Sequence, residues 1–260
     1  SYTLTSNNYF TLSNKVLTMK EKTPVGEYSL TIKATDTKSG ANKTATIKVT
    51  VFAKNIDGVT ITLSPTSYTY DGSAKTPTVT VKDGENTTLT KDTDYTVSYT
   101  NNTNAGTASV TITGKGNYKG TKSQTFTINK ATITVPTATY CNTLTYNGAS
   151  QTLTKAAPTG FKFANNTGID AGEYSITASL TNTTNYKWSD NTTGNQTFKC
   201  SISKKSATIT AKAQTINYKG TITNNINQIE TSGLVTGHEV TGITLTASTT
   251  NATQNGTITP

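Results

Sequence analysis

The chain has 260 residues, of which 32% are hydrophobic and only 14% are charged, and about one residue in four is Thr. Its formal net charge of +9 comes from Lys alone, because the sequence contains no Arg. Scattered Lys without the guanidinium fork argues against a nucleic-acid-binding protein, and no apolar run is long enough to span a membrane.

One block of sequence recurs along the chain. In each copy, apolar residues alternate with Thr, Ser or Lys, and this period of two predicts β-strands. Turn-forming Gly, Asn and Asp lie between the alternating stretches, and no stretch has the period of a helix. The three clearest copies are VGEYSLTIKATD at 25–36, NAGTASVTITGKGNY at 104–118 and DAGEYSITASLTNTTNY at 170–186. Their spacing of about 75 residues is close to the size of one small β domain.

The repeats divide the chain into four expected modules. Residues 1–54 hold too few strands for a complete sandwich, whereas 55–130 and 131–205 contain the whole pattern. Residues 206–260 open like the others but do not reach a copy of the GEYSITA strand, so we expect a truncated module. The joints contain no Pro/Gly-rich linker, and we therefore predict an all-β chain of tandem sandwiches in an elongated, monomeric rod.

The repeated motifs resemble the tandem immunoglobulin-like modules of bacterial surface proteins. The stretch ATITAKAQTINYKG with TSGLVTGHEVTGITLTAS, within 206–260, resembles the start of an MBG-type adhesin module. Residues 131–205 resemble a related module through TYNG, DAGEYSITASL and NYKWSDNTTG. Residues 56–130 resemble the bacterial surface repeat through YDGSAKTPTVTV, DYTVSYTNNTNAG and TITGKGNYKG.

Residues 9–52 resemble the second half of a cadherin-like module through YFTLS, EYSLTIKATD and TATIKVTV. In cadherins the Asp of the second motif helps to bind calcium, and Asp36 occupies that position. The segment after the last strand, Phe52–Asp57, lacks the acidic cluster of the cadherin linker. Because calcium requires several oxygen ligands at one point, we expect no metal site and no cofactor.

The resemblance implies a non-enzymatic stalk or adhesion region of a bacterial protein that is secreted or attached to the cell surface or cell wall. It implies partners such as host or cell-wall glycans or proteins, without naming one. The alternative is an accessory or carbohydrate-binding region of a larger secreted glycoside hydrolase. In either case the chemistry of this chain is recognition or spacing, and we expect no catalytic residues.

The two cysteines, Cys141 and Cys200, both fall within 131–205. Aligning QTFTI at 124–128 with QTFKC at 196–200 places Cys200 at the position of Ile128, whose side chain is expected to point inward. Cys141 lies in a short insertion near the first strand of its module. Since the first and last strands of immunoglobulin-like sandwiches often run side by side, we expect a disulfide and an oxidising compartment. The alternative is two buried free thiols.

Few other side chains suggest a site. Trp188, with Tyr186, could form a sugar-stacking platform, although a structural role for both rings is the competing interpretation. His238 is the only histidine and lies in a turn-like sequence. Asp92 and Asp94 share one face of an extended segment, but the repeat pattern indicates a turn there.

Overall fold

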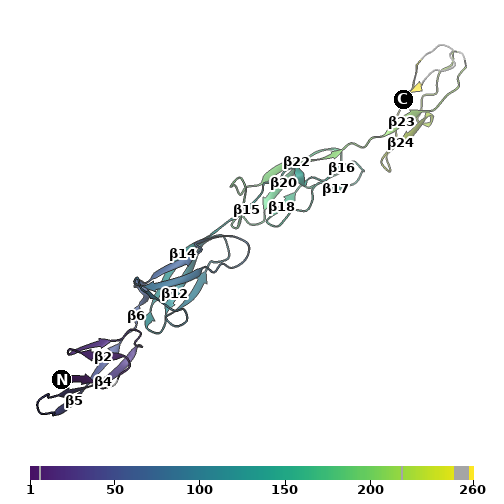
Figure 1. Ribbon diagram of the computed structural model, residues 1–260. Helices are drawn as coiled ribbons and strands as arrows, with labels where there is room; N and C mark the ends of the chain where they lie inside the picture. The colour runs from purple at the N-terminus through teal and green to yellow at the C-terminus, as the bar shows by residue number, and fades with distance from the viewer. Residues whose placement is uncertain (6, 218, 249–257) are drawn as a thin grey trace. The chain divides into compact units, whose positions relative to one another are not determined.

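The computed structural model describes residues 1–260 except 6, 218 and 249–257. Its regular elements are β-strands, and the helical segments of the described residues are 3₁₀ turns at Ile56–Gly58, Ala138–Tyr140 and Ile226–Gln228. The chain divides into two compact units, Ser1–Ala131 and Thr132–Pro260. The predicted all-β class is confirmed, and Figure 1 labels the main strands.

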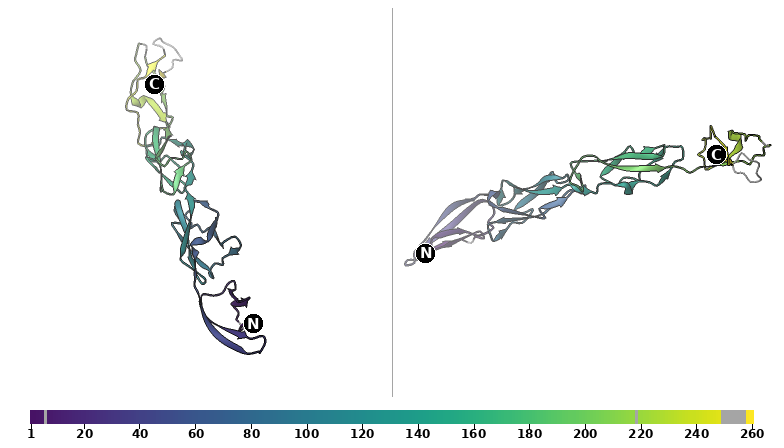
Figure 2. Two further views of the ribbon diagram at one scale, coloured as in Figure 1. Left: turned by 90° about the vertical axis from the view of Figure 1, so that its left-hand side faces the viewer. Right: turned by 90° about the horizontal axis from the view of Figure 1, so that it is seen from above.

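The N-terminal part of the first unit consists of one sheet and one separate hairpin. The sheet has the order β1-β4-β5, with β1 at Tyr2–Leu4, β4 at Gly26–Thr35 and β5 at Asn42–Val51. The hairpin pairs β2 (Phe10–Ser13) with β3 (Val16–Met19). Figure 2 shows the long β4–β5 ribbon in purple from two further directions. This region has a small core, in which Phe10 and Leu30 are buried.

The rest of the first unit is a sandwich of two main sheets. One sheet has the order β10-β9-β7 and the other β11-β12-β14-β8. A further short parallel pair joins β13 to β6. The strand bounds are β6 Lys54–Asn55, β7 Thr60–Ser64, β8 Ser67–Thr69, β9 Thr78–Asp83, β10 Thr87–Thr88, β11 Tyr95–Thr100, β12 Gly106–Gly114, β13 Tyr118–Lys119 and β14 Thr121–Asn129.

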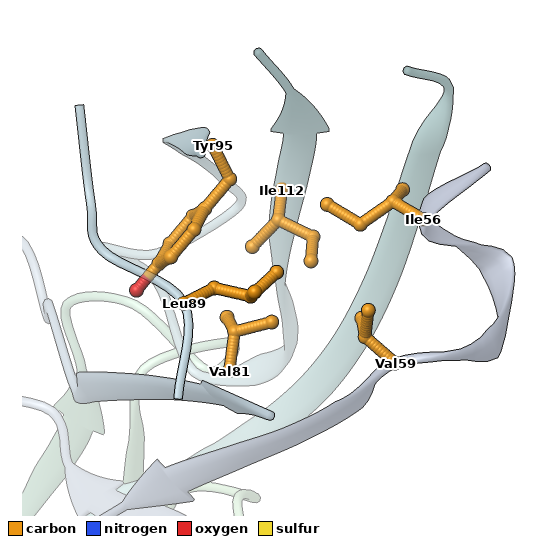
Figure 3. Close-up of a cluster of buried hydrophobic side chains, with 6 residues drawn as sticks. All are labelled: Ile56, Val59, Val81, Leu89, Tyr95 and Ile112. Atoms are coloured by element: carbon orange, nitrogen blue, oxygen red, sulfur yellow. The ribbon is translucent and has the colours of Figure 1, made fainter. Parts of the chain in front are cut away.

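The core of this sandwich follows from the alternation of its strands. Val81 of β9 and Ile112 of β12 face each other from opposite sheets, and Tyr95 of β11 closes one side. Ile56 in the 3₁₀ turn, Val59 just after it and Leu89 complete the cluster shown in Figure 3. A second buried cluster, formed by Leu63, Ala108, Val110, Phe126 and Ile128, continues the core. Burial of these apolar surfaces is the main stabilising contribution in a module with so few hydrophobic residues.

The second unit contains one four-stranded sheet and several strand pairs. Its largest sheet has the order β16-β22-β20-β18, and the remaining pairs are β17-β19, β15-β21, β23-β24 and β25-β26. The strand bounds are β15 Ala131–Ile133, β16 Leu144–Thr145, β17 Gln151–Thr152, β18 Phe161–Ala164, β19 Thr167–Gly168, β20 Gly172–Leu180, β21 Tyr186–Trp188, β22 Gln196–Ser203, β23 Thr208–Ala211, β24 Ile229–Ser232, β25 Thr246–Ala247 and β26 Ile258–Thr259.

The four-stranded sheets of the two units have matching connections. In each, an early strand runs parallel to the last strand: β8 pairs with β14, and β16 pairs with β22. The last strand pairs antiparallel with the repeated GTASV or GEYSI strand, which in turn pairs with β11 or β18. This shared order is that of immunoglobulin-like β-sandwich modules. In each module, a strand from its early part pairs with the outer edge of its last strand.

The repeated strand begins with the same backbone conformation in all three copies. Gly26, Gly106 and Gly172 have φ of 156°, 140° and 157°, values that residues with a Cβ rarely adopt. Gly therefore stands at the first position of each of these strands because the backbone there has a positive φ. Two residues later, the Tyr28 hydroxyl donates to the Pro24 carbonyl at 2.6 Å, and the Tyr174 hydroxyl donates to the Asp170 carbonyl at 2.8 Å. Each tyrosine thus fixes the turn that leads into its strand.

Candidate functional site

The structure contains a disulfide between Cys141 and Cys200, with the Cα atoms 5.4 Å apart. Cys141 follows the 3₁₀ turn Ala138–Tyr140 and forms an isolated antiparallel bridge with Thr154. Cys200 lies on β22 and is only 3% exposed. The bond therefore joins the segment just before β16 to the last strand of the same sandwich, as the sequence predicted.

The strand register corrects one detail of the alignment. Cys200 pairs with Tyr174, and the equivalent residue of the other sandwich, Ala108, pairs with Phe126. Cys200 therefore takes the place of Phe126 and not of Ile128. A shift of two residues keeps a side chain on the same face of a strand. The inward position of Cys200 was therefore predicted correctly, although the residue taken as its equivalent in the first sandwich was wrong.

Cys200 is part of a buried cluster with Leu153, Ile176 and Ile202. This cluster also packs against half-buried rings and against Leu144 of β16. The disulfide thus adds a covalent tie to a core that is already formed by apolar contacts, at the point where the first and last strands meet. Closing a loop between residues 59 apart lowers the entropy of the unfolded chain and stabilises the folded module.

Trp188 does not form a surface platform. Its side chain is fully buried, and its indole Nε1 donates to the Gly194 carbonyl at 2.6 Å. The ring packs edge-on against Phe161, with the centroids 5.6 Å apart. The ligand-facing interpretation of this residue is therefore wrong, because the strand alternation points its ring into the core.

Tyr186, on the same short strand, is half-buried against the same cluster. Its ring lies over Gly160, whose φ is +105°. A Cβ at Gly160 would lie 2.2 Å from Ile133 Cδ1 and 3.3 Å from the Tyr186 ring. The absence of a side chain at Gly160 therefore lets its backbone approach Ile133 of β15 and Tyr186 of β21, and the role of Tyr186 is packing.

The acidic candidates serve the backbone of turns. Asp92 has a positive φ of 68°, and an Asp94 carboxylate oxygen accepts a hydrogen bond from the Thr90 amide at 2.7 Å. The Asp36 carboxylate accepts from the Ser39 hydroxyl and from the amides of Lys38 and Ser39, and these hydrogen bonds, the hydroxyl first, lower its pKa. Asp36 thereby closes the turn between β4 and β5. Among the described residues, no group of three His, Cys, Asp or Glu side chains is arranged to hold a metal ion.

His238 has a partner that the sequence did not reveal. Its Nε2 lies 3.2 Å from the hydroxyl of Tyr146, and the two rings meet edge-on. His238 is exposed, and Tyr146 is half-buried. The pair is a surface contact and brings no nucleophile or carboxylate to the imidazole.

A charged network lies at the entry to the first sandwich. Lys54 Nζ donates to both carboxylate oxygens of Asp83, at 2.7 and 2.8 Å, and the Tyr118 hydroxyl donates to the same carboxylate at 2.9 Å. The hydrogen bond from Lys54 lowers the pKa of Asp83. Burial, together with the hydrogen bond to Asp83, raises the pKa of Tyr118 to about 12.

Asn117 makes the second contact at this entry, and the sequence analysis missed it. Its side-chain amide donates to the Thr23 carbonyl at 3.0 Å and accepts from the Val25 amide at 3.0 Å. The Asn117 side chain thus makes the two hydrogen bonds that a neighbouring strand would otherwise make with the backbone of the segment leading into β4. The recurrent Asn-Tyr dipeptide was visible in the sequence, but a contact between residues more than 90 positions apart leaves no local signal.

The comparisons with known proteins give little beyond this geometry. No family model matches the chain, and no curated protein matches it. Among solved structures, the chain is similar to the protocadherin gammaB7 EC3-6 cis-dimer structure, with 10% identity over 88% of this chain and 76% of that one. It is also similar to cadherin-like domains 1 to 4 of zebrafish RET, with 9% identity over 78% of this chain and 65% of that one. Both TM-scores are 0.20, so the fold assignment depends on the strand pairing of this chain itself.

Within the described residues, no helix has the length and apolar character needed to cross a membrane.

Proposed function

We propose that this chain is a non-enzymatic stalk and adhesion region of a bacterial cell-surface or secreted protein. Its modules are 1–54, 55–130, 131–205 and 206–260, and they hold or present other parts of the protein outside the cell. The repeated sandwich order and the sequence resemblance to bacterial surface modules support this proposal. The disulfide supports an oxidising location.

The observation that carries the proposal is the parallel pairing of the early and last strands in each sandwich. In residues 55–130 the Thr127 amide donates to the Thr66 carbonyl at 3.0 Å, and the Tyr70 amide donates to the Asn129 carbonyl at 2.9 Å. Tension applied to the two ends of a module pulls β8 and β14 in opposite directions along their own axes. The hydrogen bonds between them are therefore loaded together in shear, the geometry that best resists unfolding under tension.

The same pairing is reinforced in residues 131–205. The Tyr146 amide donates to the Ser203 carbonyl at 2.9 Å, and the disulfide lies a few residues before this contact. Under tension, the chain between Cys141 and Cys200 cannot extend while the bond is intact. A module tied in this way changes little in length even after its hydrogen bonds break.

Single-molecule force spectroscopy on the 260-residue chain tests the proposal. Unfolding of 55–130 should release about 75 residues at about 3.5 Å each, roughly 260 Å. Unfolding of 131–205 should release about 200 Å less than that until a reductant is added, because 59 positions are tied off. If adding the reductant leaves every extension step unchanged, the tied segment is not part of a module that carries tension.

A matched pair of variants tests the shear geometry. Thr127→Pro removes the amide that bonds to β8, whereas Thr125→Pro removes an amide on the same side of β14 but outside the paired stretch Thr127–Asn129. We expect the force needed to unfold 55–130 to fall with Thr127→Pro and to change less with Thr125→Pro. Equal forces for the two variants would contradict the assignment of tension to the β8–β14 pair. Binding to a panel of host and cell-wall glycans tests the adhesion role separately.

A further inference from the structure

The turn after β16 contains the dipeptide Asn147–Gly148. The residues from Asn147 to Ser150 are exposed and lie outside any strand. The Asn147 Oδ1 atom accepts a hydrogen bond from the Ala149 amide at 2.9 Å, which is the contact of an Asx-turn. The turn therefore holds the side-chain carboxamide beside the backbone of the residues that follow it.

This arrangement favours the loss of the Asn147 amide group as ammonia. The Gly148 amide nitrogen attacks Asn147 Cγ, so that an N–Cγ bond forms, the bond from Cγ to the side-chain nitrogen breaks, and ammonia leaves with the proton of the Gly148 amide. Water then opens the five-membered imide ring at either of its carbonyl carbons and leaves aspartate or isoaspartate. Among the residues that the structure describes, no acceptor is bonded to the Gly148 amide, and glycine is the residue whose backbone rotates most freely into the geometry of ring closure.

The first sandwich already has the product residue in the equivalent turn. The motifs SYTYDG at 67–72 and TLTYNG at 143–148 align, so Asp71 takes the position of Asn147. The Asp71 carboxylate accepts a hydrogen bond from the Ser73 amide at 2.8 Å, two residues further on, as the Asn147 side chain does in its own turn. An aspartate at position 147 therefore fits this turn.

The two turns differ in what surrounds this position. In the first sandwich, Lys75 forms an ion pair with Asp71. By the same alignment, Gln151 takes the place of Lys75 in the second sandwich and carries no charge. A carboxylate at position 147 is therefore available to a cation from another part of the chain.

The imidazole of His238 lies against this turn. A Cβ at Gly148 would lie 2.9 Å from Val235 Cγ1 and 3.7 Å from His238 Nε2, and the same nitrogen contacts the Tyr146 hydroxyl. The other titratable groups here are Tyr146 itself and Glu239, which follows His238 in the chain. A new carboxylate at position 147 therefore comes close to the imidazole.

We propose that Asn147 is a site of spontaneous deamidation, and that the carboxylate formed there pairs with His238. The reaction places a negative charge between the proposed modules 131–205 and 206–260, in a chain whose formal net charge is +9. Because a carboxylate favours the charged form of a nearby imidazole, the contact between the two turns gains an ion pair. The chain thus contains a slow, irreversible change whose extent records the age of the molecule.

Peptide mass spectrometry of the 260-residue chain tests the reaction during incubation at mildly alkaline pH. We expect Asn147 to be converted in the folded chain about as fast as in a chain unfolded by urea and a reductant. Asn142 and Asn165 lie in the same module without a following Gly, so they are internal controls and should remain amides over the same period. The other Asn-Gly pair, Asn255–Gly256, is read from a different peptide. An Asn147 that stays an amide in the folded chain while the unfolded chain is converted would overturn the proposal, as would equal conversion at Asn142.

A matched pair of variants tests the contact with His238. Asn147→Asp supplies the product directly, whereas Asn165→Asp adds the same charge in a different exposed turn of the module. His238 is the only histidine, so its ring protons can be followed individually by NMR spectroscopy. In Asn147→Asp these signals, recorded at neutral pH, should move toward the positions that they take in the wild-type chain at acidic pH, and Asn165→Asp should leave them unchanged. Signals that stay in place in both variants, or move equally in both, would contradict the pairing even if Asn147 is deamidated.

Discussion

Breaking the disulfide should selectively destabilise the second sandwich, which is the proposed module 131–205. The informative variant is Cys141→Ser, because Cys141 is only half-buried and the remaining Cys200 thiol still fills its place in the core. With the cysteines 59 positions apart, the chain-entropy model gives a loss of about 4 kcal/mol in the free energy of unfolding. For a module of about 75 residues this corresponds to a fall in Tm of roughly 15–30 °C.

The chain carries its own probe for this experiment. Trp188 is the only tryptophan and is fully buried in the affected module, so its fluorescence reports the unfolding of 131–205 alone. The thermal transition followed by Trp fluorescence should move to lower temperature when a reductant is added to the wild-type chain. In Cys141→Ser it should lie at the lower temperature without a reductant. The first sandwich contains no cysteine, so the exchange rates of the Val110 and Phe126 amides should stay the same.

A shift of less than about 5 °C in the Trp transition would refute the reasoning. It would mean that the reduced, unfolded chain is already as restricted as the cross-linked one, so that closing the loop changes little. A large shift together with faster exchange at Val110 would also contradict the expectation, because it would show that the two sandwiches unfold as one cooperative unit.

Four further changes have defined outcomes. Phe161→Ala removes a ring that is 4% exposed and packs against Trp188, and it should cost about 3–5 kcal/mol of module stability by Trp fluorescence. The control Ile169→Ala, at a side chain in the same module that is 50% exposed, should cost less than about 0.5 kcal/mol. Asn117→Ala should speed hydrogen exchange at the Val25 amide, whereas Asn117→Asp keeps the acceptor and should leave that amide protected. Lys54 lowers the pKa of Asp83 in the folded state. The stability from this pair is therefore present above the unfolded pKa near 3.8 and is lost as the pH falls through the folded pKa. Asp83→Asn should accordingly flatten the acid limb of a curve of stability against pH. The pKa of Tyr118 is raised from 10.0 to about 12, so its contribution to stability is present below pH 10.0 and is lost as the pH rises toward 12. Tyr118→Phe should therefore flatten the alkaline limb of the same curve. Limbs that stay unchanged in the two variants would contradict this reasoning.

The parts of this fold that the sequence predicted are those that depend on local pattern. The alternation in Tyr174–Ala178 and its copies predicted strands with one buried face, and the strands are there because a period of two leaves no other way to bury Ile176. Gly was expected where the chain turns between such strands, and Gly26, Gly106 and Gly172 have a positive φ at the first position of each copy, which is a local property of the backbone.

Contacts between distant residues were predicted only where a repeat supplied a template. The Cys141–Cys200 pair could be expected because the resemblance placed the first and last strands together. The residue equivalent to Cys200 in the first sandwich was, however, predicted two positions too late along β14. The bonds from Asn117 to Thr23 and Val25 had no template, since they join two modules of different sequence. Trp188 was ambiguous because aromatic rings serve both cores and surfaces, and only its complete burial in the folded module assigns it to the core.

The two sandwiches share one strand order but fill one equivalent buried position with different residues. Both use a parallel strand to cover the edge of the last strand, with Ile128 and Ile202 at equivalent points. The first sandwich fills the position of Cys200 with Phe126, which is 2% exposed, and so gains apolar burial there. In the second, a smaller sulfur occupies this place, and the disulfide to Cys141 compensates by restricting the unfolded chain. A module with a thin core can therefore be stabilised by packing or by a covalent tie at the same pleat, and the choice determines whether its stability depends on the redox conditions around it.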